Sequence, residues 1–153
     1  AVPKADMSTS RNIRVPLKPG YFTVPDDPAE PPRLLGSRCR RCGEHYFPRR
    51  AICARAECLS EDLEDVELGP EGTLYSYTFV HMPLFGSSNL EHMEGYGVGQ
   101  IDLPEGPRVQ FPLAGKREDF HIGQHLIAEL DKMREEGNTE VVILRFRPLE
   151  VRR

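Results

Sequence analysis

Four cysteines are the residues of this sequence whose type and spacing best fit a defined chemistry. They are the chain's only cysteines and form the pattern C-x2-C-x10-C-x4-C: Cys39, Cys42, Cys53 and Cys58. Two close pairs separated by a loop can place four thiolates around one tetrahedral ion. Gly43 directly follows the second cysteine, where a metal-binding turn often needs an unrestricted backbone. The spacing predicts a zinc site, although the four residues between Cys53 and Cys58 lie at the long end of the usual ligand spacing.

Other chemistries could use the same four thiols. Disulfides belong to an oxidising compartment, but the sequence starts without the apolar stretch of a secretory signal. A redox dithiol at Cys39 and Cys42 would leave the second pair of cysteines without a role. Iron in a rubredoxin-like site would use all four thiolates. We favour zinc because nothing else in the sequence indicates electron transfer.

A closed site of four sulfurs limits the chemistry left to the chain. It has no open position for a water nucleophile, so its metal would be structural, and it leaves no thiol for nucleophilic catalysis. The sequence also lacks the G-x-S-x-G, P-loop, dinucleotide-binding and H-E-x-x-H motifs. His45 could replace a cysteine, and His121 and His125 could form a second site, but Gly123 disfavours the helix that the latter pair would need. We therefore expect a chain that is not catalytic on its own.

The elements that must position these cysteines are predicted to be strands. From Gly72 onward the side chains follow a period of two, and candidate strands lie at residues 73–80, 96–103, 108–113, 124–132 and 139–151, with one helical turn at 116–121. Five short strands without a long amphipathic helix favour a small closed or nearly closed β-barrel. Residues 1–32 contain seven of the fourteen prolines, so this segment is predicted to be an extended arm.

Charge is distributed in blocks along the chain, whose net charge is −4. Residues 33–58 contain seven arginines against two glutamates, whereas residues 60–72 contain six acidic side chains and no basic one. Adjacent blocks of opposite sign are expected to attract each other, and four thiolates with one Zn²⁺ contribute a further negative charge. The overall charge gives no attraction to nucleic acid, and no apolar run is long enough to cross a membrane.

The segment 81–93 is the candidate surface for a protein partner. It carries apolar side chains between two predicted strands, where a free-standing barrel normally has polar residues. Methionines suit adaptable contacts. The candidate contact residues are His81, Met82, Phe85, Leu90 and Met93. The alternative is that this loop folds back over one end of the barrel.

Several runs of residues together resemble one known family. They are Arg38–Gly43, Tyr46–Arg49, the cysteines Cys53 and Cys58, Glu71–Thr78, Ile101–Gly106 and Ile122–Gln124. The resemblance, which covers roughly residues 33–150, is to the acyl-CoA-associated family that joins a rubredoxin-like zinc ribbon to a C-terminal OB-fold. It implies a zinc ribbon at 33–66 and a five-stranded OB-fold barrel at 67–153. Together with the extended Pro-rich arm at 1–32, this predicts a mainly β chain. The wider second cysteine pair and the Pro-rich arm depart from the family pattern.

The resemblance also implies a function. Such proteins are accessory subunits of thiolase-like catalytic subunits (thiolases, aldolases or hydratases) that act on CoA thioesters, and the small subunit of a thiolase of the benzoylsuccinyl-CoA type is the most specific expectation. We expect structural Zn²⁺, a hetero-oligomer that binds CoA or acyl-CoA, and a cytoplasmic location. Candidate phosphate contacts are Arg38, Arg40, Arg41, Arg49 and Arg50.

The alternative function is a nucleic-acid-binding module, because zinc ribbons and OB-folds both occur in such proteins. Tyr75, Tyr77 and Phe79 alternate along one predicted strand and could stack on bases. Alternating aromatics in a small barrel also fit its core. The acidic block at residues 60–72 argues against nucleic acid as the partner.

Overall fold

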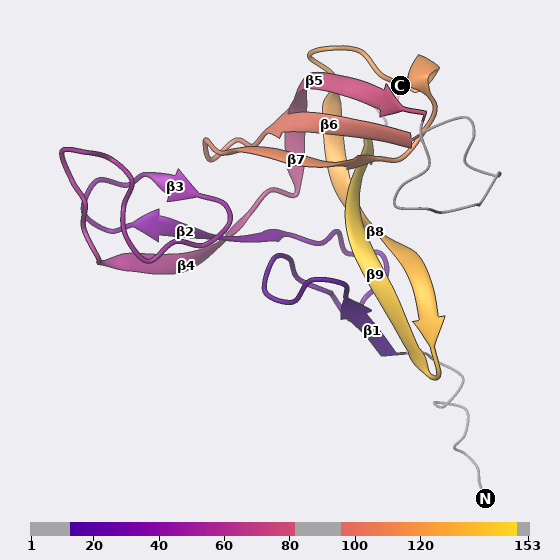
Figure 1. Ribbon diagram of the computed structural model, residues 1–153, viewed down its shortest axis with the longest axis horizontal. Coiled ribbons are helices and arrows are strands. Elements are labelled where there is room, and N and C mark those ends of the chain that lie inside the picture. The colour runs from indigo at the N-terminus through magenta and orange to yellow at the C-terminus, as the bar shows by residue number, and fades with distance from the viewer. Residues whose placement is uncertain (1–12, 82–95, 150–153) are drawn as a thin grey trace, which may run out of the picture.

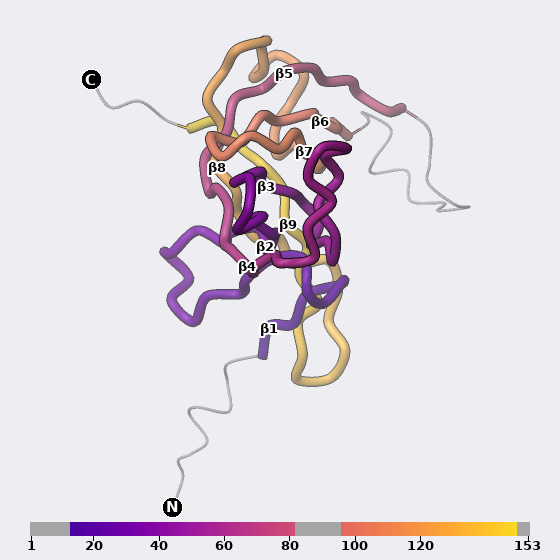
Figure 2. The backbone as a smooth tube through the Cα atoms, turned by 90° about the vertical axis from the view of Figure 1, so that its left-hand side faces the viewer, coloured from indigo at the N-terminus to yellow at the C-terminus, as the bar shows by residue number. Residues whose placement is uncertain are grey.

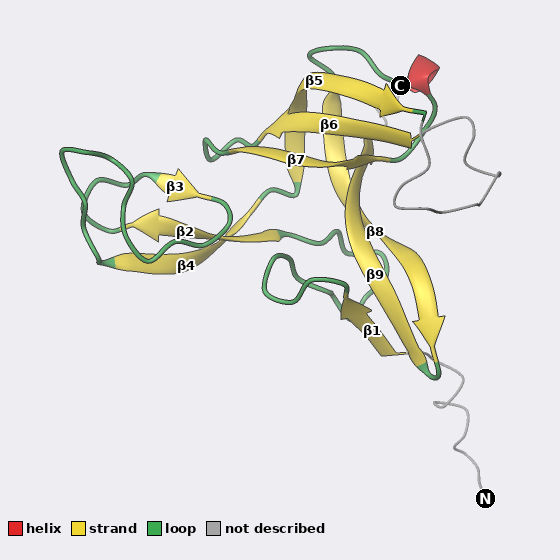
Figure 3. Cartoon of the chain, viewed as in Figure 1, coloured by secondary structure: helices red, strands yellow, loops and turns green. Residues whose placement is uncertain are grey.

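The computed structural model describes residues 13–81 and 96–149, which are almost entirely strands and loops (Figures 1 and 3). The elements are β1 (Ile13–Pro16), β2 (Leu34–Cys39), β3 (His45–Tyr46), β4 (Leu63–Leu68), β5 (Glu71–Val80), β6 (Tyr96–Asp102), β7 (Arg108–Leu113), η3 (Arg117–Asp119), β8 (His125–Glu136) and β9 (Thr139–Pro148). Helix in these ranges is limited to the 3₁₀ turn η3, so none of it could span a bilayer. Four residues of the candidate partner loop lie outside the described residues: Met82, Phe85, Leu90 and Met93.

Strands β5 to β9 close into a barrel, which confirms the mainly β fold with a five-stranded OB-fold. The strands follow each other in the order β9-β7-β6-β5-β8, and β8 pairs with β9 to complete the ring. Two of the strand pairings that close the ring involve only a few residues. Strand β5 pairs with β8 over residues 71–73, and β7 pairs with β9 through Leu113 and Phe146. Each of the five strands overlaps a stretch that the two-residue period predicts, and β8 continues to Glu136, four residues past its predicted end.

Apolar side chains fill the interior of the barrel. The most deeply buried of them are Leu74, Ile101, Leu126, Leu144 and Phe146. Gly99 lies among these side chains on β6, where a Cβ atom would come within 2.8 Å of Leu113 Cδ2. Close packing across the barrel thus favours glycine at this position.

A β-bulge at Tyr75 changes which side of β5 faces the core. The register of β5 against β6 shifts between Leu74 and Ser76. Leu74 points inward before the shift and Phe79 after it, so even-numbered and then odd-numbered side chains fill the barrel. The single uninterrupted alternation predicted over residues 73–80 is therefore wrong. Tyr77 packs against Phe79 and Phe120, while Tyr75 is half exposed beneath the Arg108 guanidinium, so the described residues of β5 offer no continuous stacking platform for bases.

The β8–β9 hairpin runs past the barrel, and part of the N-terminal arm lies along it (Figures 1 and 2). Strand β1 adds to β9 in parallel, with Ile13 opposite Thr139 and Pro16 opposite Val142. Phe22, which follows β1, is buried in the hydrophobic core and bridges to Leu34 at the start of β2. These arm residues contact the chain's own barrel.

The three-stranded sheet β3-β2-β4 forms the ribbon that carries the cysteines. A row of aromatic rings joins it to the barrel, running from Tyr21 through Phe47 and Phe111 to Phe146 with centroid separations of 6.0, 5.8 and 5.9 Å. Leu34 pairs with Leu68 at one end of the ribbon sheet, and β5 follows Leu68 closely in the chain. Both leucines belong to the same buried cluster as the barrel interior. The ribbon and the barrel therefore share one core.

Candidate metal centre

The ribbon sheet and its two long loops bring the four cysteine sulfurs together. Cys39 ends β2, Cys42 lies in the loop to β3, and the other two cysteines lie between β3 and β4. All four Sγ atoms lie within 4.8 Å of one another, with 3.7 Å between Cys39 and Cys58 and 3.6 Å between Cys42 and Cys53. None of them is in a disulfide.

These separations fit a tetrahedral metal ion. Sulfurs about 2.3 Å from a central zinc lie about 3.8 Å from one another, whereas the two sulfurs of a disulfide are about 2 Å apart. Among the residues that the structure describes, this is the only group of three or more His, Cys, Asp or Glu side chains close enough to share an ion. His121 and His125 form no such group. The donor set and its spacing support a structural zinc, as the sequence predicts.

Hydrogen bonds to the sulfurs set their different acidities. Backbone N–H groups, chiefly that of Cys42, donate to the Cys39 sulfur and lower the pKa of Cys39 to about 6. The Tyr46 hydroxyl, 3.2 Å from the Cys53 sulfur, lowers the pKa of Cys53. The Ser60 N–H lowers the pKa of Cys58, but burial and the neighbouring sulfurs outweigh that bond and raise the pKa to about 11. Binding of a cation to all four thiolates therefore releases protons.

The two cysteine turns share one backbone design despite their different spacing. In the first turn, the Gly43 N–H donates to the Cys39 carbonyl, 2.8 Å away. In the second, the Leu59 N–H donates to the Arg55 carbonyl, 3.0 Å away. Arg55 thus occupies the backbone position that Cys39 occupies in the first turn. Because this position of the second turn is not a cysteine, the sulfur comes from Cys53, two residues earlier in the chain. This arrangement accounts for the four residues between Cys53 and Cys58.

Leu59 occupies the position that glycine occupies in the first turn. Gly43 has φ of +86° and Leu59 has φ of +52°. Within the described ranges, Leu59 is the only non-glycine residue with positive φ. The left-handed conformation costs an L-residue roughly 1–2 kcal/mol, a cost that glycine does not bear. The second turn is consequently strained at the residue next to a metal ligand.

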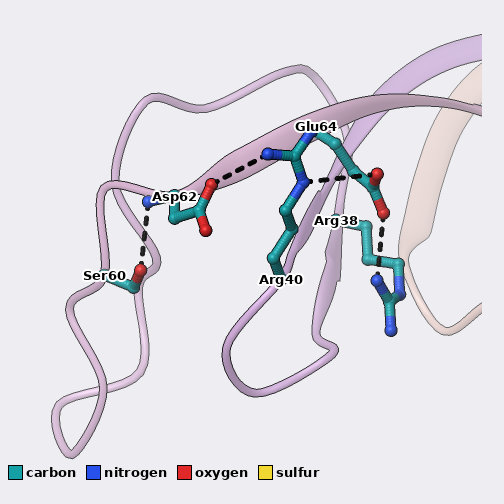
Figure 4. Close-up of polar contacts among 5 residues, drawn as sticks. All are labelled: Arg38, Arg40, Ser60, Asp62 and Glu64. Atoms are coloured by element: carbon teal, nitrogen blue, oxygen red, sulfur yellow. Dashed lines mark hydrogen bonds and ion pairs between the residues drawn. The ribbon is translucent and has the colours of Figure 1, made fainter.

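Three of the candidate phosphate-binding arginines are paired with the acidic block, and Figure 4 shows two of them, Arg38 and Arg40. Arg38 Nη1 lies 3.0 Å from Glu64 Oε2, and Arg40 contacts both Glu64 and Asp62. Arg49 lies 3.4 Å from Asp65. The expected attraction between the two charge blocks is thus confirmed, since β2 and β4 are adjacent strands. The pairing reduces the positive charge that these three arginines present to an anion.

Replacement of Glu64 by glutamine tests this pairing. The hydrogen bond from Arg38 is the main cause that holds the pKa of Glu64 below its usual range. A carboxyl group whose pKa is lowered in the folded state stabilises the fold at neutral pH and loses that contribution as the pH falls through the lowered value. Because both partners are partly exposed, we expect Glu64→Gln to cause only a small loss of stability at pH 7 and a smaller one at pH 3.

Urea unfolding at the two pH values measures this effect. Glu67→Gln is the matched control, because Glu67 is exposed on the same strand and has no arginine partner among the described residues. An equal loss for Glu64→Gln at pH 7 and pH 3 would contradict the electrostatic account.

The remaining candidate residues lie in different places. Arg41 is exposed and has no carboxylate partner in the described part of the chain. Arg50 lies over the Tyr46 ring, 5.3 Å from its centroid, and donates to the Ile52 carbonyl. His81 follows β5 at one end of the barrel, where its Nε2 atom is 2.9 Å from Arg117. The structure therefore does not bring His81 and the ribbon arginines into one cluster.

Sequence reasoning missed the role of Tyr46. Its hydroxyl is 3.2 Å from the Cys53 sulfur and accepts a hydrogen bond from the Ala54 N–H at 2.9 Å. The side chain thus connects β3 to the loop that carries the second cysteine pair. The motif Tyr46–Arg49 was a signal for the family, but its spacing alone does not reveal contact with a metal ligand.

Comparison with known proteins gives two matching family models and several relatives. The model for the rubredoxin-like zinc ribbon domain of ChsH2 matches residues 26–64, and the model for the C-terminal OB-fold domain of ChsH2 matches residues 65–131. A DUF35 domain-containing scaffold protein of Methanocaldococcus jannaschii is 32% identical over 120 residues, which are 76% of this chain and 82% of the relative.

Two further similarities involve multi-subunit enzymes. The benzoylsuccinyl-CoA thiolase subunit BbsA of Thauera aromatica is 33% identical over 102 residues, which are 67% of this chain and 65% of BbsA. Among solved structures, a chain of the Ltp2-ChsH2(DUF35) aldolase superposes with a TM-score of 0.56 at 28% identity, covering 76% of this chain and 84% of that chain. These matches confirm the resemblance to a zinc ribbon and OB-fold family.

Proposed function

Because this chain belongs to the DUF35 family, in which a rubredoxin-like zinc ribbon precedes an OB-fold, we propose that it is a non-catalytic accessory subunit of a thiolase-like complex. The observation that carries the proposal is its similarity to a thiolase subunit and to a chain of an aldolase complex. The catalytic partner would be a thiolase or a thiolase-like aldolase that acts on acyl-CoA thioesters. The accessory chain would assist assembly and CoA binding.

The cysteine site supports the non-catalytic part of this proposal. Cys39, Cys42, Cys53 and Cys58 would hold Zn²⁺, which would supply cross-linking of the ribbon and no reaction chemistry. Four sulfurs fill a tetrahedral shell, so substrate has no open position on the ion. All four cysteines of the chain belong to this cluster, so none would be left for catalysis. The nucleophilic thiol of thiolase-type chemistry would have to come from the partner.

Assistance with CoA binding would depend on arginines that are not neutralised within the ribbon. Arg41 and Arg50 have no carboxylate partner among the described residues, whereas Arg38, Arg40 and Arg49 do. Guanidinium groups bind phosphate through paired hydrogen bonds. We therefore rank the two unpaired arginines first as phosphate contacts. Segment 81–93 stays our candidate for contact with the partner or the acyl group.

Co-expression with a thiolase-like subunit from the same genome tests the proposal. We expect the two chains to elute together in gel filtration at constant stoichiometry across the peak. The same experiment with Glu67→Gln, a surface substitution outside every proposed contact, is the control and should leave the elution unchanged. A chain that always elutes alone and leaves the activity of the thiolase-like subunit unchanged would refute the proposal.

A further inference from the structure

Ser37 on β2 is the one buried polar residue in the described ranges, and both hydrogen bonds of its side chain go to Arg50. The hydroxyl oxygen accepts a hydrogen bond of 2.9 Å from the Arg50 N–H, and the hydroxyl donates to the Arg50 carbonyl, 3.4 Å away. Arg50 lies in the loop that follows β3. A buried hydroxyl needs such partners. Ser37 thus fixes the backbone of Arg50 to the ribbon sheet.

The Arg50 side chain is held by two further contacts. Its Nε atom donates to the Ile52 carbonyl, 3.0 Å away, and its guanidinium lies over the Tyr46 ring, 5.3 Å from the ring centroid. The face of an aromatic ring attracts a cation at this distance. Ile52 directly precedes Cys53, and the Tyr46 hydroxyl is 3.2 Å from the Cys53 sulfur. Both contacts therefore connect Arg50 to the same cysteine of the metal site.

These contacts leave the two terminal nitrogens of the guanidinium free. Arg50 is exposed, and its Nη1 and Nη2 atoms have no acceptor among the described residues. Exposed Glu44, in the loop before β3, forms no ion pair with Arg50 within those residues. Arg41 also lacks a carboxylate partner, but its side chain has no hydrogen bond or ring contact in the part of the chain that the structure describes. Of the two unpaired arginines, Arg50 is thus the one whose position is fixed.

We propose that Arg50 binds a phosphate group of the CoA thioester and that Ser37 is the positioning residue that holds Arg50 for this contact. The inference rests on the proposed function and deepens its CoA-binding part. Two neighbouring N–H groups of a guanidinium fit two oxygens of one phosphate. A flexible arginine loses side-chain freedom when it binds. This loss is smaller for Arg50, because its backbone, its Nε atom and its guanidinium face are already held.

Replacement of Ser37 by alanine loosens Arg50 without removing its charge. The measurement is the Kd for CoA, by calorimetric titration, of the zinc-loaded complex between this chain and the thiolase-like subunit that co-purifies with it. We expect Arg50→Gln to raise this Kd at least fivefold and Ser37→Ala at least threefold, with zinc content unchanged. In the double variant, Ser37→Ala should add nothing to the effect of Arg50→Gln, because Ser37 acts through Arg50. The Kd for pantetheine, the phosphate-free part of CoA, should stay constant.

Two substitutions within the ribbon are matched controls. Ser60→Ala removes a hydroxyl that also accepts a backbone N–H, that of Asp62. Arg55→Gln removes an arginine whose charge Glu57 already neutralises at 3.0 Å. Both variants should keep the Kd for CoA within twofold of the wild type.

The outcomes separate this inference from the proposed function. Wild-type affinity for CoA in Arg50→Gln, or an equal weakening of pantetheine binding, would overturn the inference while the proposed function stood. A Ser37→Ala complex that loses zinc, or that weakens CoA binding further in the Arg50→Gln background, would show a purely structural serine and overturn its positioning role. If no thiolase-like subunit co-purifies with the wild-type chain, the proposed function fails and the inference fails with it.

Discussion

Cys39→Ser is expected to abolish stoichiometric metal binding and to unfold the ribbon sheet. Cys39 is fully buried, and its sulfur lies 3.7 Å from that of Cys58. Zinc contributes on the order of 10 kcal/mol to the folding of small zinc modules. Apart from the cysteines, the buried side chains of the ribbon sheet are Leu34 and Leu68 at its barrel end and Ser37. Metal analysis should fall from one zinc per chain to almost none. Hydrogen exchange should show lost protection across β2 and β4, with protection in β6 and β9 retained.

His45→Ala is the control for this experiment, because His45 lies in β3 and is not among the clustered ligands. It should keep one zinc per chain. A Cys39→Ser variant that retains a full equivalent of metal would show that the four sulfurs are not the ligand set. A wild-type protein that is red when oxidised would show iron in place of zinc.

Phe146→Ala is expected to cause the largest loss of stability in the barrel. Phe146 is fully buried, and its pairing with Leu113 forms the seam between β7 and β9. Its ring also ends the aromatic row that joins the barrel to the ribbon, 5.9 Å from the Phe111 centroid. Truncation of a buried phenylalanine removes apolar contacts and leaves a cavity, which costs about 3–5 kcal/mol. Urea unfolding of the zinc-loaded chain measures this loss.

Ile122→Ala serves as the control for the barrel, since Ile122 is mostly exposed in a turn. Its free energy of unfolding should change by less than about 0.5 kcal/mol. A loss below about 1 kcal/mol for Phe146→Ala would mean that the seam repacks and that the aromatic row does not couple the two parts.

Much of the barrel could be predicted from the sequence because its strands bury one face and so follow a period of two. Strand β7 was predicted at its observed bounds, Arg108–Leu113. The bulge at Tyr75 could not be predicted, since it depends on how β5 pairs with β6. Strand β1 was missed because its backbone hydrogen bonds depend on β9, which lies near the other end of the chain. Strand β4 was hidden in the acidic block, whose side chains pair with arginines on β2.

The metal site was predictable for a different reason. Four cysteines within twenty residues fit few sites other than a four-thiolate metal site. The residue type and the spacing were therefore enough to predict this site. The strain at Leu59 was not predictable, because the wider spacing of the second pair did not reveal that Arg55 replaces a cysteine in the turn. The pairing of Arg38, Arg40 and Arg49 followed from the charge blocks, but the individual partners required the register of β2 against β4.

Reconstitution of activity tests most directly the claim that this chain is a non-catalytic subunit. The thiolase-like subunit is purified alone, and thiolytic cleavage of its acyl-CoA substrate is measured as increasing amounts of the zinc-loaded chain are added. We predict no turnover by the chain alone and a rise in turnover that reaches a plateau at a fixed ratio of the two chains. Turnover by the chain alone, or a rate that stays constant throughout the titration, would contradict the account.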